Sequence, residues 1–169
     1  MARARVIVQD LWKTKRDWDD ALEPAEIMDH QQAWENELPN LSAITLPRCY
    51  TPPNINPEMS SRQLHIFCDA SERVYGAVAY LRTEDDKQAI HTSFVMARSR
   101  VAPKKLLSMP RLELSAALVG AQLSNLLQQE LTLPLEDVVL WSDSTTVLTW
   151  LKAESCRYKV FVGTRVAQI

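Results

Sequence analysis

The sequence has no long apolar run, no cysteine pair and no large excess of either charge. No stretch approaches the roughly 20 apolar residues that a membrane-spanning helix needs, and the apolar run at residues 6–8 is too short for a signal peptide. The cysteines, Cys49, Cys68 and Cys156, form no CxxC motif and are odd in number, which favours reduced thiols over a disulfide framework. We therefore expect an intracellular protein without membrane contact.

The small net charge limits how the protein can meet a polyanion. The formal charge is -2, whereas proteins that grip nucleic acid over their whole surface are usually strongly basic. Any nucleic-acid site must therefore be a local patch. The 169 residues are 46% apolar, which suffices for one folded domain or one domain with a short appendage.

The hydrophobic pattern divides the chain into three parts. Residues 1–46 have helical spacing, with a second helix expected from Pro24. Residues 47–60 contain four prolines and predict a linker. Residues 61–169 predict an α/β fold with a mixed sheet: three antiparallel strands, a helix, a parallel strand and a helix. The expected elements are strands at 63–68, 75–81 and 89–96, a helix at 111–130, a strand at 138–141 and a helix at 144–151.

Three acidic residues occupy positions suited to a shared site. Asp69 and Asp143 each follow an apolar run, so parallel neighbouring strands would place both carboxylates at the sheet edge where α/β proteins bind ligands. Glu113 lies among leucines in the first turn of the long helix, where a buried charge needs a partner. Converging carboxylates repel one another unless a hard cation neutralises them, and Mg²⁺ or Mn²⁺ prefers oxygen ligands. Two such ions about 4 Å apart support phosphodiester hydrolysis.

Each acid also has a simpler interpretation that the sequence leaves open. Asp69 suits a turn, Asp143 suits a helix cap, and Glu113 at a helix start favours the helix dipole. The occurrence of all three in this order, with these strands between them, favours the metal site.

Residues 98–111 contain five basic side chains and no acid, which predicts a phosphate-binding patch. A solvated loop is the alternative for this segment. Ser71 and Ser144 are further candidate donors to a nucleic-acid backbone. Trp141 and Trp150 fit core packing better than base stacking. The basic residues of the patch are Arg98, Arg100, Lys104, Lys105 and Arg111.

Four short segments share the pattern of a known family. They are Phe67–Ser71, Ser99–Pro103, Arg111–Leu114 and Leu140–Ser144. These motifs resemble the ribonuclease H-like region of Bel/Pao retrotransposon polyproteins, which lies just downstream of the reverse transcriptase and is also catalogued as a Pao retrotransposon peptidase family. The resemblance implies hydrolysis of the RNA strand of RNA–DNA hybrids. It also implies that Asp69, Glu113 and Asp143 bind two Mg²⁺ or Mn²⁺ ions.

The resemblance further implies partners, a location and one departure. The partners are an RNA–DNA hybrid and the adjoining reverse transcriptase, whose tail would be residues 1–46, in the cytoplasm, the nucleus or virus-like particles. The family has a further strand and a fourth acid, whereas no aspartate follows Asp143 here and Glu154 lies elsewhere. We expect the domain at 61–169 to be incomplete at its C-terminus, which leaves a fragment without activity, or a non-catalytic or decayed module, as an alternative.

An aspartic peptidase is the remaining alternative, because that label is attached to the same polyprotein region. Such enzymes pair two aspartates that share a proton, each normally in an Asp-Ser/Thr-Gly motif. The segments at 69–71 and 143–145 lack the glycine, and neither lies in an all-β pattern. The sequence therefore favours the nuclease over the peptidase.

Overall fold

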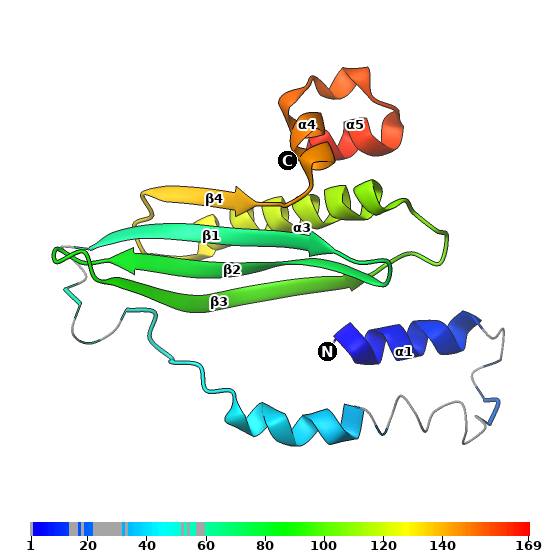
Figure 1. The fold of residues 1–169 in the computed structure, drawn as a ribbon, viewed down its shortest axis with the longest axis horizontal. Coiled ribbons are helices and arrows are strands. Elements are labelled where there is room, and N and C mark those ends of the chain that lie inside the picture. The colour runs from blue at the N-terminus through cyan, green and yellow to red at the C-terminus, as the bar shows by residue number, and fades with distance from the viewer. Residues whose placement is uncertain are drawn as a thin grey trace.

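The computed structural model has one four-stranded sheet, a long helix against it, and shorter helices before and after (Figure 1). It describes residues 2–13, 17, 19–21, 32, 34–51, 53, 55–56 and 60–169. The strands are β1 (Ser61–Ala70), β2 (Val74–Glu84), β3 (Ile90–Val101) and β4 (Asp137–Trp141). The helices are α1 (Ala2–Lys13), α3 (Met109–Glu130), α4 (Thr145–Lys152) and α5 (Val160–Val166), with 3-10 turns at η1 (Leu38–Ala43) and η3 (Ser155–Arg157).

The sheet has the order β3-β2-β1-β4. Both β1–β2 and β2–β3 pair antiparallel, whereas β1 and β4 pair parallel through the crossover helix α3. The predicted α/β fold with a mixed sheet is thereby confirmed. Most of the helix expected from Pro24 lies outside the described residues, although residues 34–37 are helical. Pro52 and Pro57 of the predicted linker also lie outside them.

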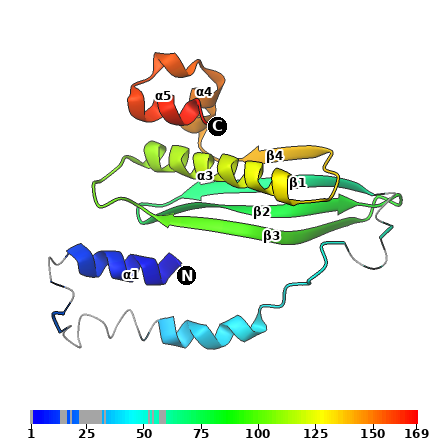
Figure 2. The same cartoon turned by 180° about the vertical axis from the view of Figure 1, so that it is seen from behind.

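One face of the sheet is covered by α3 (Figure 2). Alternate residues of β1 and β2 point to this face because side chains alternate along a strand. Gly120 lets the helix come close, since a Cβ atom there would lie 2.2 Å from Sγ of Cys68. Burial raises the pKa of the Cys68 thiol to about 11. The buried residues of this cluster are Leu64, Ile66, Cys68, Ala77, Ala79, Ala116, Val119, Leu123 and Leu127.

The opposite face carries a row of aromatic rings, and none of the described helices lies over it in Figure 1. Phe67 and Trp141 are stacked with their ring centroids 6.0 Å apart and are 45% and 48% exposed. Tyr80 meets Phe67 edge-on, and Phe94 continues the row on β3. Core packing, expected for both tryptophans, is therefore wrong for Trp141, because its position on β4 points to the open face.

A second apolar cluster joins the C-terminal helices to the first half of α3. Its buried residues are Leu114, Ala117, Val147 and Val162. Trp150 packs against this cluster, as expected for it. Consequently α4 and α5 rest on α3 and not on the sheet (Figures 1 and 2).

Helix α1 lies beside the free edge of β3. Arg5 donates to the carbonyl of Ser99 at 3.0 Å, and Gln9 donates to the carbonyl of Ala102 at 2.6 Å. Asp10 of α1 forms an ion pair with Arg73 in the β1–β2 connection. Within the part of the chain that the structure describes, none of the helices has the length and apolar character that crossing a membrane requires.

Candidate functional site

The carboxyl ends of β1 and β4 meet at one edge of the sheet, near the start of α3 (Figure 1). Phe67 pairs with Trp141 in the parallel register, and two residues further along each chain stand Asp69 and Asp143. Parallel neighbours lie about 4.8 Å apart, so the two aspartates occupy equivalent positions at this edge. The parallel pairing of β1 and β4 is the one that the sequence predicts.

The side chain of Glu113 is in direct contact with Ser144, the residue that follows Asp143. Ser144 donates a short hydrogen bond from its hydroxyl to Oε2 of Glu113. The same hydroxyl accepts from the backbone N–H of Val147 at 3.3 Å, so Ser144 caps helix α4. Helix capping by Asp143 is therefore wrong, because the neighbouring serine does it. Glu113 is half-buried and Asp143 is exposed.

Asp69 lies near the end of β1 with an exposed side chain. Its Oδ1 accepts from the backbone N–H of Ala70 at 2.7 Å. The turn that follows is held by Ser71, whose hydroxyl donates to the carbonyl of Val74 at 3.0 Å. The turn expected at 69–71 thus begins at Ser71, and Asp69 itself belongs to the strand.

The three carboxylates share an edge without forming one coordination group. Across the described residues, no three His, Cys, Asp or Glu side chains are grouped so that they could hold a metal ion. The donor set is nonetheless of the oxygen type that Mg²⁺ and Mn²⁺ accept. Because Asp69 and Asp143 are exposed, their side chains can change rotamer without disturbing the core.

A family model described as the Pao retrotransposon-like RNaseH-like domain matches residues 1–144. The match covers most of the chain, from α1 to the Glu113–Ser144 contact. The chain belongs to this family. No curated protein and no solved structure gives a significant match.

Membership in the Pao RNase H-like family confirms the resemblance that the acidic motifs carry. The mixed sheet agrees with it, whereas the aspartic peptidase gains no support from this fold. The matched segment ends at Ser144, so α4 and α5 of this Pao RNase H-like domain lie beyond it.

The predicted basic patch of the Pao domain is divided between a strand, a loop and a helix. Arg98 and Arg100 are exposed on β3, so the loop alternative is wrong for them. Lys104 donates to the carbonyl of Trp12 at 3.1 Å and lies over its ring. These contacts engage the Lys104 ammonium with α1. Lys105 is exposed between β3 and α3, and Arg111 is exposed in the first turn of α3.

Sequence reasoning missed two residues of α5. The segment from Tyr158 onward is ambiguous in its hydrophobic pattern, yet it forms a helix in which Phe161 and Arg165 stand one turn apart. Their four-residue spacing is the available signal, because residues at i and i+4 are neighbours on a helix. Arg165 stacks on Phe161, with Cζ 3.6 Å from the ring centroid.

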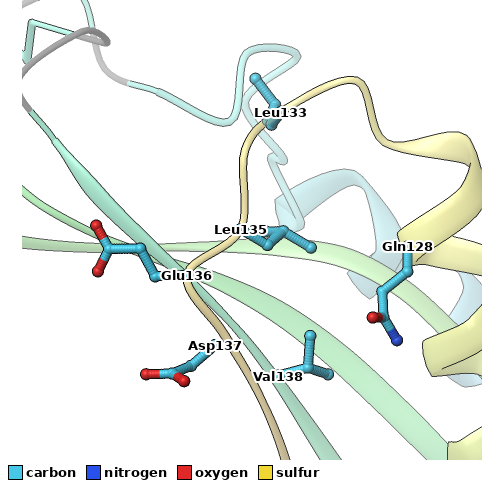
Figure 3. Close-up of a pocket in the computed structure, with 6 residues that line it drawn as sticks. All are labelled: Gln128, Leu133, Leu135, Glu136, Asp137 and Val138. Carbon is cyan, nitrogen blue, oxygen red and sulfur yellow. The ribbon is translucent and has the colours of Figure 1, made fainter.

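An open depression lies at the opposite end of the sheet, between the end of α3 and the start of β4 (Figure 3). Its acids are already engaged: Glu136 accepts from Ser61 at 2.7 Å, and Asp137 accepts from Gln63 at 3.5 Å. Figure 3 shows both carboxylates pointing away from Gln128 on α3. The depression therefore adds no acid to the edge that carries Asp69.

Proposed function

We propose that this Pao RNase H-like domain hydrolyses the RNA strand of RNA–DNA hybrids, with Asp69, Glu113 and Asp143 as ligands of two Mg²⁺ or Mn²⁺ ions. The observation that supports it best is the parallel register of β1 and β4 together with the Ser144–Glu113 contact. These two features bring three acidic segments, far apart in sequence, to one edge. When bound, the ions would activate the attacking water and stabilise the leaving oxygen.

The residues of the chain have distinct parts in this proposal. Ser144 restrains the carboxylate of Glu113, which leaves its other oxygen, Oε1, for a cation. Asp69, near the end of β1, and Asp143, two residues after β4, are exposed and would supply the remaining ligands. Such carboxylates repel one another unless a cation lies between them. The positions of the three carboxylates therefore depend on whether metal is bound.

The proposed substrate is supported by the family and by the basic side chains near the edge. Arg98 and Arg100 on β3, Lys105 before α3 and Arg111 in the first turn of α3 are exposed and available to phosphate groups. In the parent polyprotein the domain would adjoin a reverse transcriptase. The hydrogen bonds from α1 to the carbonyls of Ser99 and Ala102 would then connect the preceding segment to this domain.

The test is cleavage of an end-labelled RNA–DNA hybrid by the purified chain with Mg²⁺. We expect Asp69→Asn and Asp143→Asn each to lower the cleavage rate at least about 100-fold, because removing a metal ligand removes transition-state stabilisation. EDTA abolishes cleavage, and added Mn²⁺ restores it. The matched control is Asp137→Asn, the same change at the other end of β4, which leaves the rate within about twofold. Cleavage that persists in EDTA, or in Asp69→Asn, contradicts the proposal.

A non-catalytic nucleic-acid-binding module is the second candidate. It is favoured by the lack, within the described part of the chain, of a group of three side chains that could hold a metal. Under this candidate the chain binds the hybrid without cleaving it. Binding would then be equal for the native chain and for Asp69→Asn, with or without Mg²⁺.

A further inference from the structure

Two arginine side chains from different helices lie against one phenylalanine ring. Cζ of Arg111 lies 5.1 Å from the ring centroid of Phe161, and Cζ of Arg165 lies 3.6 Å from it. Arg111 belongs to the first turn of α3, whereas Phe161 and Arg165 belong to α5. The aromatic ring attracts each cation and favours holding both guanidinium groups beside it.

Neither guanidinium has an acidic partner among the described residues. Arg165 donates from Nη1 to the carbonyl of Phe161 at 3.0 Å, and its Nε is buried without a hydrogen-bond partner. The side chain of Arg111 lies over the ring of Phe161, and the described residues give its guanidinium no hydrogen-bond or ion-pair partner. A guanidinium carries five N–H donors, so most donors of this pair are unused. Two like charges beside one ring therefore favour a bound anion.

The arginine pair lies at the end of α3 that also carries Glu113. Arg111 precedes Glu113 by two residues, and α5 packs on the first half of α3 (Figures 1 and 2). A cation in the first turn of a helix is opposed by the helix dipole, and no acid in that turn offsets it. The expected place of Glu113 in the first turn is wrong, because α3 begins at Met109 and Glu113 is its fifth residue. The two guanidinium groups and the helix dipole thus place positive charge at the start of α3, the helix that also carries the Glu113–Ser144 contact.

We infer that Arg111 and Arg165, positioned by Phe161, bind a backbone phosphate of the nucleic acid that reaches the acidic edge. This inference rests on the proposed function for the identity of the ligand. A planar guanidinium can grip two phosphate oxygens at once, and phosphate contacts set the register of a strand on a protein. The site extends the nucleic-acid interface beyond residues 98–111 and beyond the segment that the family match covers.

The test is binding of a fluorescein-labelled RNA–DNA hybrid, measured by anisotropy in EDTA buffer at several salt concentrations. We expect Arg111→Gln and Arg165→Gln each to weaken binding about 3- to 10-fold. Each should lower the slope of log affinity against log salt by about 1, and the double variant by about 2. The matched control is Arg157→Gln, because Arg157 is exposed in the same C-terminal region and pairs with Glu154. Its affinity and slope should stay at the native values.

The outcomes separate this inference from the proposed function. Native affinity and native salt slope in both arginine variants overturn the inference, while metal-dependent cleavage by the native chain leaves the proposed function standing. A native chain that neither binds nor cleaves the hybrid overturns both. If circular dichroism shows that Arg165→Gln is unfolded, the exposed Arg111→Gln and the charge-retaining Arg165→Lys decide. Arg165→Lys should keep the salt slope and lose part of the affinity.

Discussion

Gly120 determines how closely α3 approaches the sheet. A Cβ atom at this position would lie 2.2 Å from Sγ of Cys68 and 3.5 Å from Cγ2 of Ile66. Both neighbours are buried on β1, directly before the acidic edge, so they have little room to move. Interiors packed as densely as organic crystals pass such a clash on as a shift of whole elements. The distance between Glu113 and the ends of β1 and β4 therefore depends on this glycine.

Gly120→Ala should destabilise the protein, although alanine is the better helix former by about 1 kcal/mol. The clash with Cys68 outweighs that gain, and we expect a net loss of roughly 1–3 kcal/mol in the free energy of unfolding. Urea denaturation measures it, with Gln122→Ala on the exposed side of α3 as the control. Cys68→Ala removes the sulfur and should recover most of the loss in the double variant. A Gly120→Ala variant as stable as the native chain would show that α3 can retreat freely.

At the same scale, the sequence predicts the positions of the acids better than their contacts. Asp69 and Asp143 stand out because each interrupts an apolar strand at its end, a pattern visible in one dimension. The bond between Ser144 and Glu113 joins residues 31 positions apart, and no local pattern encodes it. The approach of Arg111 to Phe161 is likewise not encoded locally, although the spacing of Phe161 and Arg165 on one helix is.

Among the elements, β3 shows where local patterns stop short. The alternation that predicts a strand ends at residue 96, yet β3 continues to Val101. Its pairing with β2 extends it, since Gly76 pairs with Ser99 and Tyr75 with Arg100. Arginines interrupt the apolar pattern but do not prevent strand pairing, because backbone groups make the ladder. Tertiary pairing thus places Arg98 and Arg100 on a rigid strand.

Helix α4 depends on the N-cap residue that precedes it, and Ser144→Ala tests this. The substitution removes the cap on Val147 and the donor to Glu113, so we expect the free energy of unfolding to fall by about 1 kcal/mol. Thermal denaturation followed by circular dichroism measures the loss. Thr146→Ala, an exposed position in the first turn of the same helix, should cost less than half as much. Equal effects of the two substitutions would argue against a capping role for Ser144.

For the whole molecule, α3 connects two apolar clusters that share no other described helix. One side of α3 packs Ala116, Leu123 and other residues against β1 and β2. Its first half packs Leu114 and Ala117 against Val147 and Val162. The C-terminal helices therefore have no large apolar contact except through α3. If α3 leaves the sheet, both clusters lose their common partner.

This arrangement predicts that sheet and C-terminal helices unfold together. Leu123→Ala creates a cavity at a fully buried position in the sheet cluster and should cost about 2–4 kcal/mol. Leu123 belongs only to the sheet cluster. We nevertheless expect the amides of α5 to lose as much protection against hydrogen exchange as the amides of β1. The reason is that both elements would then exchange through global unfolding. NMR-detected exchange measures both elements in one sample, and Gln122→Ala again serves as the surface control. If α5 exchanges through its own opening, its rates will not respond to Leu123→Ala. Arg165 would then lie on a helix that detaches independently of α3 and of Arg111.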